Sequence, residues 1–221
     1  MLVSAVLPTR ARRSMVAQAV SCFLSQTWAE KELVILDDAD DPSFPNPPEH
    51  PQIRYFRTDI HYWLSIPQKR NAVNGLANGE IIWHLDSDDW SSPTRMEDQV
   101  RRLEETGKAV TGYHSMDFFD EAAGKVYEYR SGPYYALGSS LCYQRSFWQD
   151  NPFDENYRHG SDTVFVRVAR LRGQLDAVDS EGRMVARLHS GNSHGKGFPS
   201  VHFQDRTVDQ FPSWFQALVS A

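Results

Sequence analysis

The sequence predicts an α/β fold in which helices flank a mostly parallel sheet, followed by a small antiparallel lobe. Three observations indicate this fold. Short apolar runs alternate with segments of helical periodicity in residues 1–107, two of these runs end in clusters of aspartate, and the pattern after residue 108 changes to closely spaced strands. Parallel strands need crossover connections, and the intervening helical segments supply them.

Four apolar runs in the first half are expected to be strands. They cover residues 2–7, 32–36, 53–56 and 80–85. Most are rich in leucine, isoleucine or valine, which is typical of strands buried on both faces. Prolines crowd residues 42–51 and exclude a helix or a central strand, so a surface loop is expected there.

Three segments of the same half have helical spacing. The first starts at Ser14, a candidate N-cap. The second opens at Pro67, where the missing N–H costs nothing, and ends at Gly79. The third has the clearest boundaries, with Ser92–Pro93 as N-cap and first helical residue and Gly107 just past its end.

The second half has shorter strands and one further helix. The expected strands are residues 108–116, 125–130, 138–143 and 184–189, the first two forming a hairpin. Ser161 is expected to cap a helix that ends at Gly173. A polar, glycine-rich loop should follow over residues 190–197.

Composition excludes several classes of protein. The chain has 221 residues, 40% of them hydrophobic and 24% charged, which excludes a disordered or fibrous chain. No apolar run approaches the ~18 residues of a membrane span, and the first run is broken at Pro8 too early for a signal peptide, so a cytoplasmic protein is expected. Cys22 and Cys142 lie too far apart to suggest a disulfide framework. The net charge of −6 disfavours broad nucleic-acid binding.

The sequence Asp86-Ser87-Asp88-Asp89 is the most informative feature for function. It follows directly on an apolar strand, and in open parallel sheets ligands bind at such strand ends. If the segment is extended, Asp86 and Asp88 point the same way and can present two carboxylates to one hard cation. The alternative is a solvated acidic turn that precedes the helix beginning at Ser92.

Three classes of metal site have a similar pattern. An EF-hand loop is excluded because Ser91 stands where glycine is required. Phosphatases of the haloacid dehalogenase type resemble it, but they carry the motif on the first strand of the core, whereas here two strand and helix units come first. The D-x-D motif of nucleotide-sugar glycosyltransferases remains.

Five motifs in order resemble glycosyltransferase family 2 of the GT-A fold. They are Val6-Leu7-Pro8-Thr9-Arg10, Leu33-Val34-Ile35-Leu36-Asp37-Asp38, Lys69-Arg70-Asn71-Ala72 with Gly79-Glu80, Leu85-Asp86-Ser87-Asp88-Asp89, and Phe153-Asp154-Glu155 leading to Ser161-Asp162. The resemblance covers roughly residues 3–195. It implies a GT-A fold, with a Rossmann-like sheet and a small antiparallel lobe on the acceptor side.

The resemblance also implies roles on the donor side. The residues implied to bind the nucleotide-sugar are Pro8, Thr9, Arg10, Asp37, Asp38, Lys69, Arg70, Asn71 and Asp86. Asp37 or Asp38 would contact the base, although Ala39-Asp40 replaces the usual Gly-Ser after them. Lys69 and Arg70 would lie near the diphosphate.

The implied metal ligands are Asp86, Asp88 and His189, and the implied catalytic base is Asp162. Ser161 stands where the family usually has a second acidic residue before this Asp. A carboxylate in the first turn of a helix is also a common structural feature, and a lone histidine is more often structural than a ligand. Lys196 could add a phosphate contact, and Trp90, Tyr134, Tyr135 and Trp148 could stack on sugars or belong to the core.

The resemblance implies a metal-dependent inverting glycosyltransferase, with Mn²⁺ or Mg²⁺ as cofactor and a UDP-sugar as the default donor. The acceptor would be a saccharide or another hydroxyl-bearing molecule, and a nucleic acid only as a modified base. One GT-A domain is expected, with residues 1–107 binding the donor, 108–200 carrying the acceptor side and the base, and 201–221 forming a tail. Two alternatives remain: a noncatalytic carbohydrate-binding or nucleotide-sugar-binding module, and a GT-A-like nucleotidyltransferase, although Pro8-Thr9-Arg10-Ala11 lacks the glycines of the latter.

Overall fold

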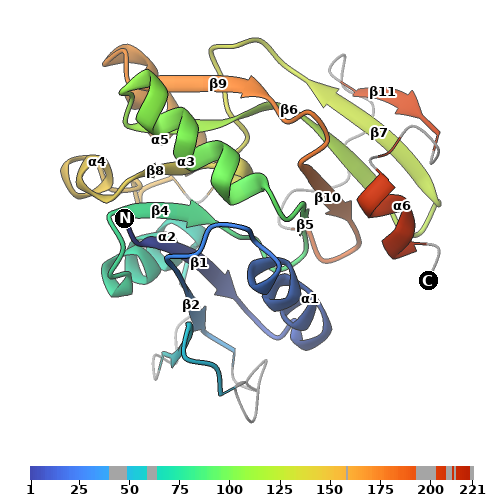
Figure 1. Ribbon diagram of the computed structural model, residues 1–221, viewed down its shortest axis with the longest axis horizontal. Coiled ribbons are helices and arrows are strands. Elements are labelled where there is room, and N and C mark those ends of the chain that lie inside the picture. Colours follow the sequence, from blue (N-terminus) through green and yellow to red (C-terminus); the bar gives the residue numbers. More distant parts are fainter. Residues whose placement is uncertain are drawn as a thin grey trace.

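The computed structural model describes residues 1–39, 49–58, 64–157, 159–192, 203–207, 211 and 213–219. Within them, helices flank an 11-stranded mixed sheet (Figure 1). The elements of the first half are β1 (Val3–Thr9), α1 (Arg13–Leu24), β2 (Lys31–Asp37), β3 (Ile53–Arg57), α2 (Ile66–Leu76), β4 (Ile81–His84), β5 (Trp90–Ser91) and α3 (Arg95–Thr106). Strands β1 to β4 are parallel in the order β4-β1-β2-β3, which confirms the predicted fold class.

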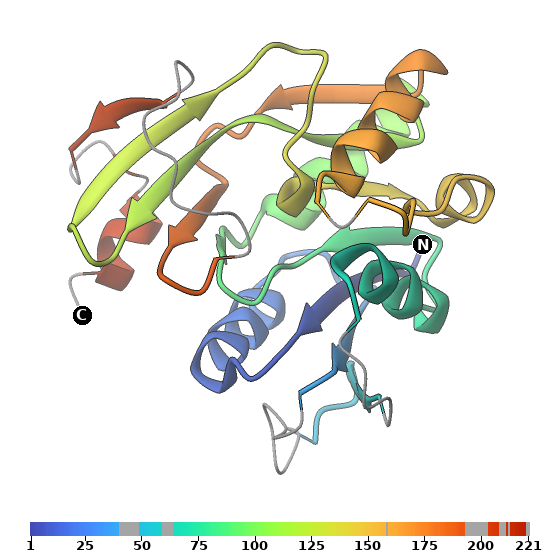
Figure 2. The same cartoon turned by 180° about the vertical axis from the view of Figure 1, so that it is seen from behind.

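The second half continues the same sheet. Its elements are β6 (Val110–Asp120), β7 (Lys125–Arg130), the 3₁₀ helix η1 (Gly138–Ser140), β8 (Cys142–Gln144), α4 (Arg145–Asp150), α5 (Ser161–Leu171), β9 (Leu175–Asp179), β10 (Met184–Leu188), β11 (Phe203–Arg206) and α6 (Ser213–Val219). Strand β8 is antiparallel to both β4 and β6, so it joins the two halves. Figure 2 shows β11 at the edge of the β6–β7 hairpin.

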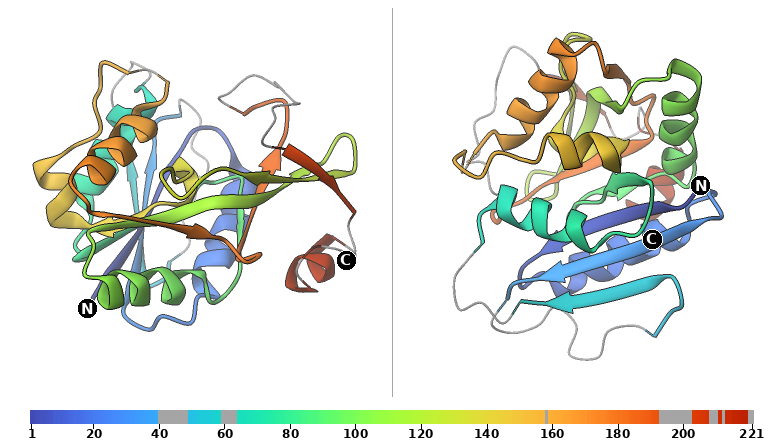
Figure 3. Two further views of the ribbon diagram at one scale, coloured as in Figure 1. Left: turned by 90° about the horizontal axis from the view of Figure 1, so that it is seen from above. Right: turned by 90° about the vertical axis from the view of Figure 1, so that its left-hand side faces the viewer.

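Two hydrophobic cores cover the two faces of the parallel strands. Because side chains alternate along a strand, Ala5 and Leu7 of β1 face α1 and α3, whereas Val6 faces α2 and α5. Figure 3 shows α1 and α2 on opposite sides of β1 and β2. With both faces covered, only the strand ends are open to a ligand.

Three predicted N-caps are wrong by one or two positions. Helix α1 is capped at Arg12 instead of Ser14, and α3 at Thr94 instead of Ser92. The N–H of Ser92 donates to the Arg183 carbonyl, which extends the pairing of β5 with β10 by one residue, and α3 begins only at Arg95. Helix α5 is capped by Gly160 at φ 77°, a left-handed conformation that glycine adopts without strain, and Ser161 is its first residue.

Tertiary pairing produces strands that the local pattern did not predict. Strand β5 pairs with β10, and β9 pairs with β6. Neither β5 nor β9 was expected from the sequence. Strand β6 extends to Asp120, four residues beyond the expected end. The expected strand 138–143 is instead η1 followed by β8, because Ser140 turns the chain with hydrogen bonds from its N–H and Oγ to the Leu137 carbonyl.

Residues 203–219 include β11 and α6, which pack on the rest of the chain. Phe215 of α6 lies 5.0 Å from the Trp90 ring, centroid to centroid, in a cluster that also includes Cys22 of α1. None of the helices in the described ranges has the length and apolar content needed to cross a bilayer. Cys22 and Cys142 are buried free thiols, and burial raises the pKa of each.

Candidate active site

A cavity of about 1040 Å³ opens at the carboxyl ends of β1 and β4. Its lining comes from both halves of the chain: β1, α2 and the acidic turn after β4 on one side, and β6, β7, η1, α5 and β10 on the other. This is the edge at which ligands bind in open parallel sheets. The predicted residues Pro8, Thr9, Arg10, Lys69, Arg70, Asp86, Asp88 and Asp162 all line it.

The acidic segment after β4 is a turn, not the extended strand that the sequence suggested. The N–H of Asp89 donates to the Asp86 carbonyl at 3.4 Å, which closes the turn. Among the described residues, none donates a hydrogen bond to the Asp86 carboxylate. Burial raises the pKa of Asp86, and the neighbouring charge of Asp88 adds to this effect, while Arg70 opposes it. A cation would relieve this accumulation of negative charge.

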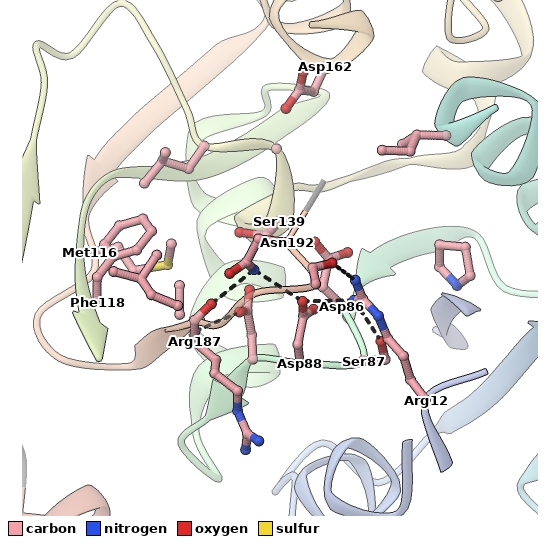
Figure 4. Close-up of a pocket in the computed structure, with 18 of the residues that line it drawn as sticks. Arg12, Asp86, Ser87, Asp88, Met116, Phe118, Ser139, Asp162, Arg187 and Asn192 are labelled. Carbon is pink, nitrogen blue, oxygen red and sulfur yellow. Dashed lines mark hydrogen bonds and ion pairs between the residues drawn. The ribbon is translucent and has the colours of Figure 1, made fainter. Parts of the chain in front are cut away.

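Asp88 accepts hydrogen bonds from two other segments of the chain (Figure 4). Its Oδ2 lies 2.8 Å from Arg12 Nη1, 3.0 Å from His189 Nε2 and 3.4 Å from Asn192 Nδ2. Arg12 also donates to the carbonyl of Gly191 at 2.6 Å. The turn after β4, the start of α1 and residues 189–192 are therefore tied together at one carboxylate.

The hydrogen bonds of His189 define its tautomer. The N–H of Gly191 donates to Nδ1 at 3.0 Å, so Nδ1 is the acceptor and Nε2 carries the proton that it donates to Asp88. A neutral histidine that binds a metal through Nε2 must carry its proton on Nδ1. In this arrangement, His189 is a partner of Asp88.

Asp89 points away from Asp88 and into the sheet. Its Oδ1 accepts from the N–H of Arg187 at 3.1 Å. Burial raises the pKa of Asp89 well above its ordinary value, and the charges of Asp88 and Asp86 add to the shift. Asp89 thus ties the turn to β10 and also lines the cavity.

A fully buried arginine compensates this negative charge from behind. Arg95 is 0% exposed, donates to Ser91 Oγ at 2.9 Å and to the Ser139 carbonyl at 3.1 Å, and its guanidinium lies 4.4 Å from the Trp83 ring. Sequence reasoning did not find it because it lies within an otherwise ordinary amphipathic helix.

On the donor side, the structure separates the predicted residues into two groups. Lys69 and Arg70 line the cavity, but Asp37 and Asp38 do not. Lys69 Nζ forms an ion pair with Asp38 Oδ1 at 2.6 Å, and the Asp38 side chain is completely buried. Asp37 accepts from the hydroxyl of Tyr55 at 2.8 Å. Burial lowers the pKa of Lys69, and Asp38 opposes that shift.

Asn71 faces away from the cavity. Its amide donates to the Phe153 carbonyl at 2.8 Å and to Glu155 at 3.0 Å, and its Oδ1 accepts from the indole of Trp148. Through these contacts, Asn71 of the Lys-Arg-Asn motif anchors the segment that leads into α5. The nucleotide contact of Asn71 stays a prediction.

Asp162 lies in the first turn of α5, on the far side of the cavity from Asp88 (Figure 4). Its carboxylate packs on Gly138, where an added Cβ would lie 2.0 Å from Asp162 Oδ2. His84 supports this glycine by bonding its carbonyl through Nδ1 at 2.9 Å and bonding Tyr143 through Nε2. Burial lowers the pKa of His84 well below its ordinary value, so the ring is neutral.

Of the aromatic residues considered as sugar-stacking groups, some line the cavity and others do not. Tyr135 lines the cavity, whereas Tyr134 is 71% exposed outside its lining. Trp90 is buried beneath α6, with the Arg187 guanidinium 4.0 Å from its ring, and Trp148 is bonded to Asn71. Lys196 and the acidic residues Asp40 and Asp41 lie outside the described residues.

The helix-flanked, mostly parallel sheet with a ligand cavity at its carboxyl edge defines a GT-A fold. The family described as glycosyl transferase family 2 matches residues 4–181, and the chain belongs to it. No curated protein matches the chain.

Crystal structures of TarS from S. aureus share the fold. The complex of residues 1–349 with UDP-GlcNAc aligns with a TM-score of 0.69 and 17% identity over 90% of this chain and 62% of that one. The complex with UDP aligns with a TM-score of 0.65 and 17% identity over 85% of this chain and 61% of that one. This chain therefore spans about three-fifths of the length of these TarS structures.

Proposed function

We propose that the protein is a metal-dependent, inverting glycosyltransferase that transfers a sugar from a UDP-sugar to an acceptor hydroxyl. The placement of Asp162 across one cavity from the acidic turn carries this proposal. Membership of the family and the UDP-GlcNAc complex of a protein with the same fold support it. Residues 1–107 would bind the donor and residues 108–200 would carry the acceptor side.

The donor would lie along β1 and the start of α2. Pro8 and Thr9 would lie beneath the nucleoside, and Arg10, Lys69 and Arg70 would face its diphosphate, because cationic side chains stabilise phosphate charge. The completely buried Asp38 would hold Lys69 in place instead of contacting the base.

The carboxylates at this site suit a divalent cation that binds together with the nucleotide. Within the described ranges, no three His, Cys, Asp or Glu side chains converge into a metal cage. Asp86 and Asp88 would therefore supply two carboxylates, and diphosphate oxygens the remaining ligands, as is usual for Mg²⁺ and Mn²⁺. Such a cation neutralises the charge that develops on the leaving diphosphate. His189 could join only after its proton moved to Nδ1.

Asp162 would act as the general base. The acceptor hydroxyl oxygen bonds to the anomeric carbon, its proton passes to Asp162, and the bond between that carbon and the diphosphate oxygen breaks with its electron pair leaving on UDP. Because attack comes from the side opposite the leaving group, the anomeric configuration inverts.

Thermal denaturation with UDP, with and without Mn²⁺, tests donor binding directly. A ligand that binds the native state must raise the melting temperature. We expect UDP with Mn²⁺ to raise it more than either alone. If neither UDP nor UDP-GlcNAc with Mn²⁺ raises it, the proposal is wrong.

A noncatalytic binding module is the second candidate. It is favoured by Ser161, which replaces the family's acidic residue and is 2% exposed. A binding module would bind UDP-sugar with metal but release no UDP in the presence of any acceptor. Release of UDP that depends on Asp162 excludes it.

A further inference from the structure

One wall of the cavity is apolar and aromatic and contains none of the residues assigned above to donor binding. It consists of Met116, Phe118, Tyr127, Tyr129, Ala186 and Leu188, here called the aromatic wall. The strand register explains why these residues share a face. Met116 pairs with Tyr129 and Phe118 with Tyr127 across the hairpin, and Ala186 pairs with Phe118 on the other side.

The opposite face of these strands is occupied by other residues. Phe119, Val126 and Val185 point away from the cavity and pack with Phe211 and Phe215 of the C-terminal segment. The sheet is therefore supported from behind. Within the wall, Met116 and Ala186 are buried in a cluster with Tyr113 and Met184, and Phe118 packs against it. Tyr127, Tyr129 and Leu188 are half-buried at the cavity.

Charge is segregated between the two sides of the cavity. Among the lining residues that the structure describes, Arg10, Arg12, Lys69 and Arg70 all come from the donor side. Strand β10 contributes Arg187, but its guanidinium turns to the back of the sheet, over Trp90 and 3.1 Å from Glu121. Asp120 is the charged residue beside the wall, and its carboxylate accepts from two N–H groups of the hairpin turn.

We propose that the aromatic wall is the acceptor subsite and that it binds an uncharged saccharide. This rests on the proposed function. A pyranose presents an apolar C–H face and a rim of hydroxyl groups, and tyrosine rings offer both an apolar face and a polar edge. The carboxylates of Asp120 and Asp162 disfavour an anionic acceptor.

The site has the dimensions of a large ligand pocket. Ligand cavities measure ~300–1000 Å³, and this one has about 1040 Å³. The rings of Phe118 and Tyr129 lie 6.2 Å apart at 63°, so they form a corner that can hold a ring against two surfaces. Figure 4 shows Met116 and Phe118 to one side of the space between Asp88 and Asp162.

Saccharide titrations without donor test the subsite independently of catalysis. The probes are methyl glycosides of neutral disaccharides and an oligomer of glycerol phosphate. Their binding is measured by saturation-transfer NMR and calorimetry. We expect the neutral probes to bind and Phe118→Ala or Tyr129→Ala to weaken binding about tenfold. UDP affinity with Mn²⁺ should stay within about twofold. Tyr157→Ala, an exposed tyrosine outside the cavity, should change neither.

Three results would overturn the proposal: tighter binding of the anionic oligomer, no binding of any neutral probe, or unchanged binding in both variants. Phe118→Leu and Tyr129→Leu keep more of the packing volume and serve if an alanine variant unfolds. Failure of the proposed function would appear separately, as absence of UDP binding, while the saccharide titration would still give its answer.

Discussion

The guanidinium of Arg12 lies 2.8 Å from the carboxylate of Asp88, 76 residues later in the chain. Arg12 also occupies the N-cap position of α1 without capping it through its side chain. An arginine placed here neutralises Asp88 at the position where a divalent cation would do so. The cation and the arginine should therefore compete.

Replacing Arg12 tests that competition. In Arg12→Ala, we expect Mn²⁺ to bind severalfold more tightly in the absence of nucleotide, because Asp88 no longer has a tethered positive charge. Calorimetric titration with MnCl₂ measures this, with Arg13→Ala as the control for net charge. Equal or weaker Mn²⁺ binding by Arg12→Ala would show that the two do not compete.

Asp162→Asn tests the proposed base. Loss of a general base should lower the transfer rate by about two orders of magnitude or more, whereas the affinity for UDP with Mn²⁺ should change less than twofold. Steady-state kinetics and calorimetry separate these effects. Asp150→Asn, at the exposed end of α4, should behave as wild type. A rate that survives in Asp162→Asn removes this residue from the role.

Gly138→Ala should displace the Asp162 carboxylate while leaving the residue itself unchanged. The new Cβ would lie 2.0 Å from Asp162 Oδ2, so the carboxylate must move. We expect a loss of stability of about 1–3 kcal/mol, typical of overpacking, together with a lower kcat. Gly132→Ala is the matched control, since its Cβ would meet nothing within 4 Å. Unchanged melting temperature and kcat in Gly138→Ala would contradict this account of the contact.

The role of Lys69 in stability, through its ion pair with Asp38, should be separable from its proposed role in UDP binding. Lys69→Ala leaves a completely buried carboxylate unpaired, which costs roughly 3–5 kcal/mol, and also removes the proposed phosphate contact. Adding Asp38→Asn should restore most of the stability but not the affinity for UDP. Denaturant unfolding and UDP titration of both variants check this. Recovery of both properties together would mean that Lys69 does not contact the nucleotide.

Glu32 gives a prediction for pH dependence. Burial alone would raise its pKa, but hydrogen bonds from Ser4, Asn78 and Arg54 outweigh burial and hold the pKa below its ordinary value. The folded chain therefore binds this proton less tightly than the unfolded chain does. The resulting stability is present above the unfolded pKa and is lost as pH falls through the folded one.

In Glu32→Gln, we expect a loss of about 1–3 kcal/mol at pH 7 that shrinks steadily below about pH 4.5. Thermal or urea unfolding over pH 3 to 8 measures it. Glu30→Gln, an exposed neighbour on the same connection, is the control. A difference that does not depend on pH would show that the charge of Glu32 is not responsible.

Much of the candidate site follows from local sequence. Apolar runs ending at Asp37 and Asp86 place carboxylates at strand ends in any parallel sheet, and Gly107 ends α3 at φ 66° as predicted. Asp162 falls in the first turn of a helix that its own periodicity defines. These features depend on neighbours within a few residues, so the sequence alone determines them.

Long-range contacts decided the rest. The sequence does not indicate whether a carboxylate at a strand end points into the cavity, as Asp86 does, or is buried against a lysine, as Asp38 is. Arg12 meets Asp88 only because α1 and the turn after β4 converge. The face shared by Phe118 and Tyr129 depends on the register of β6 and β7, in which a shift of one residue would turn every side chain to the other side. Periodicity fixes elements, and packing fixes where their side chains point.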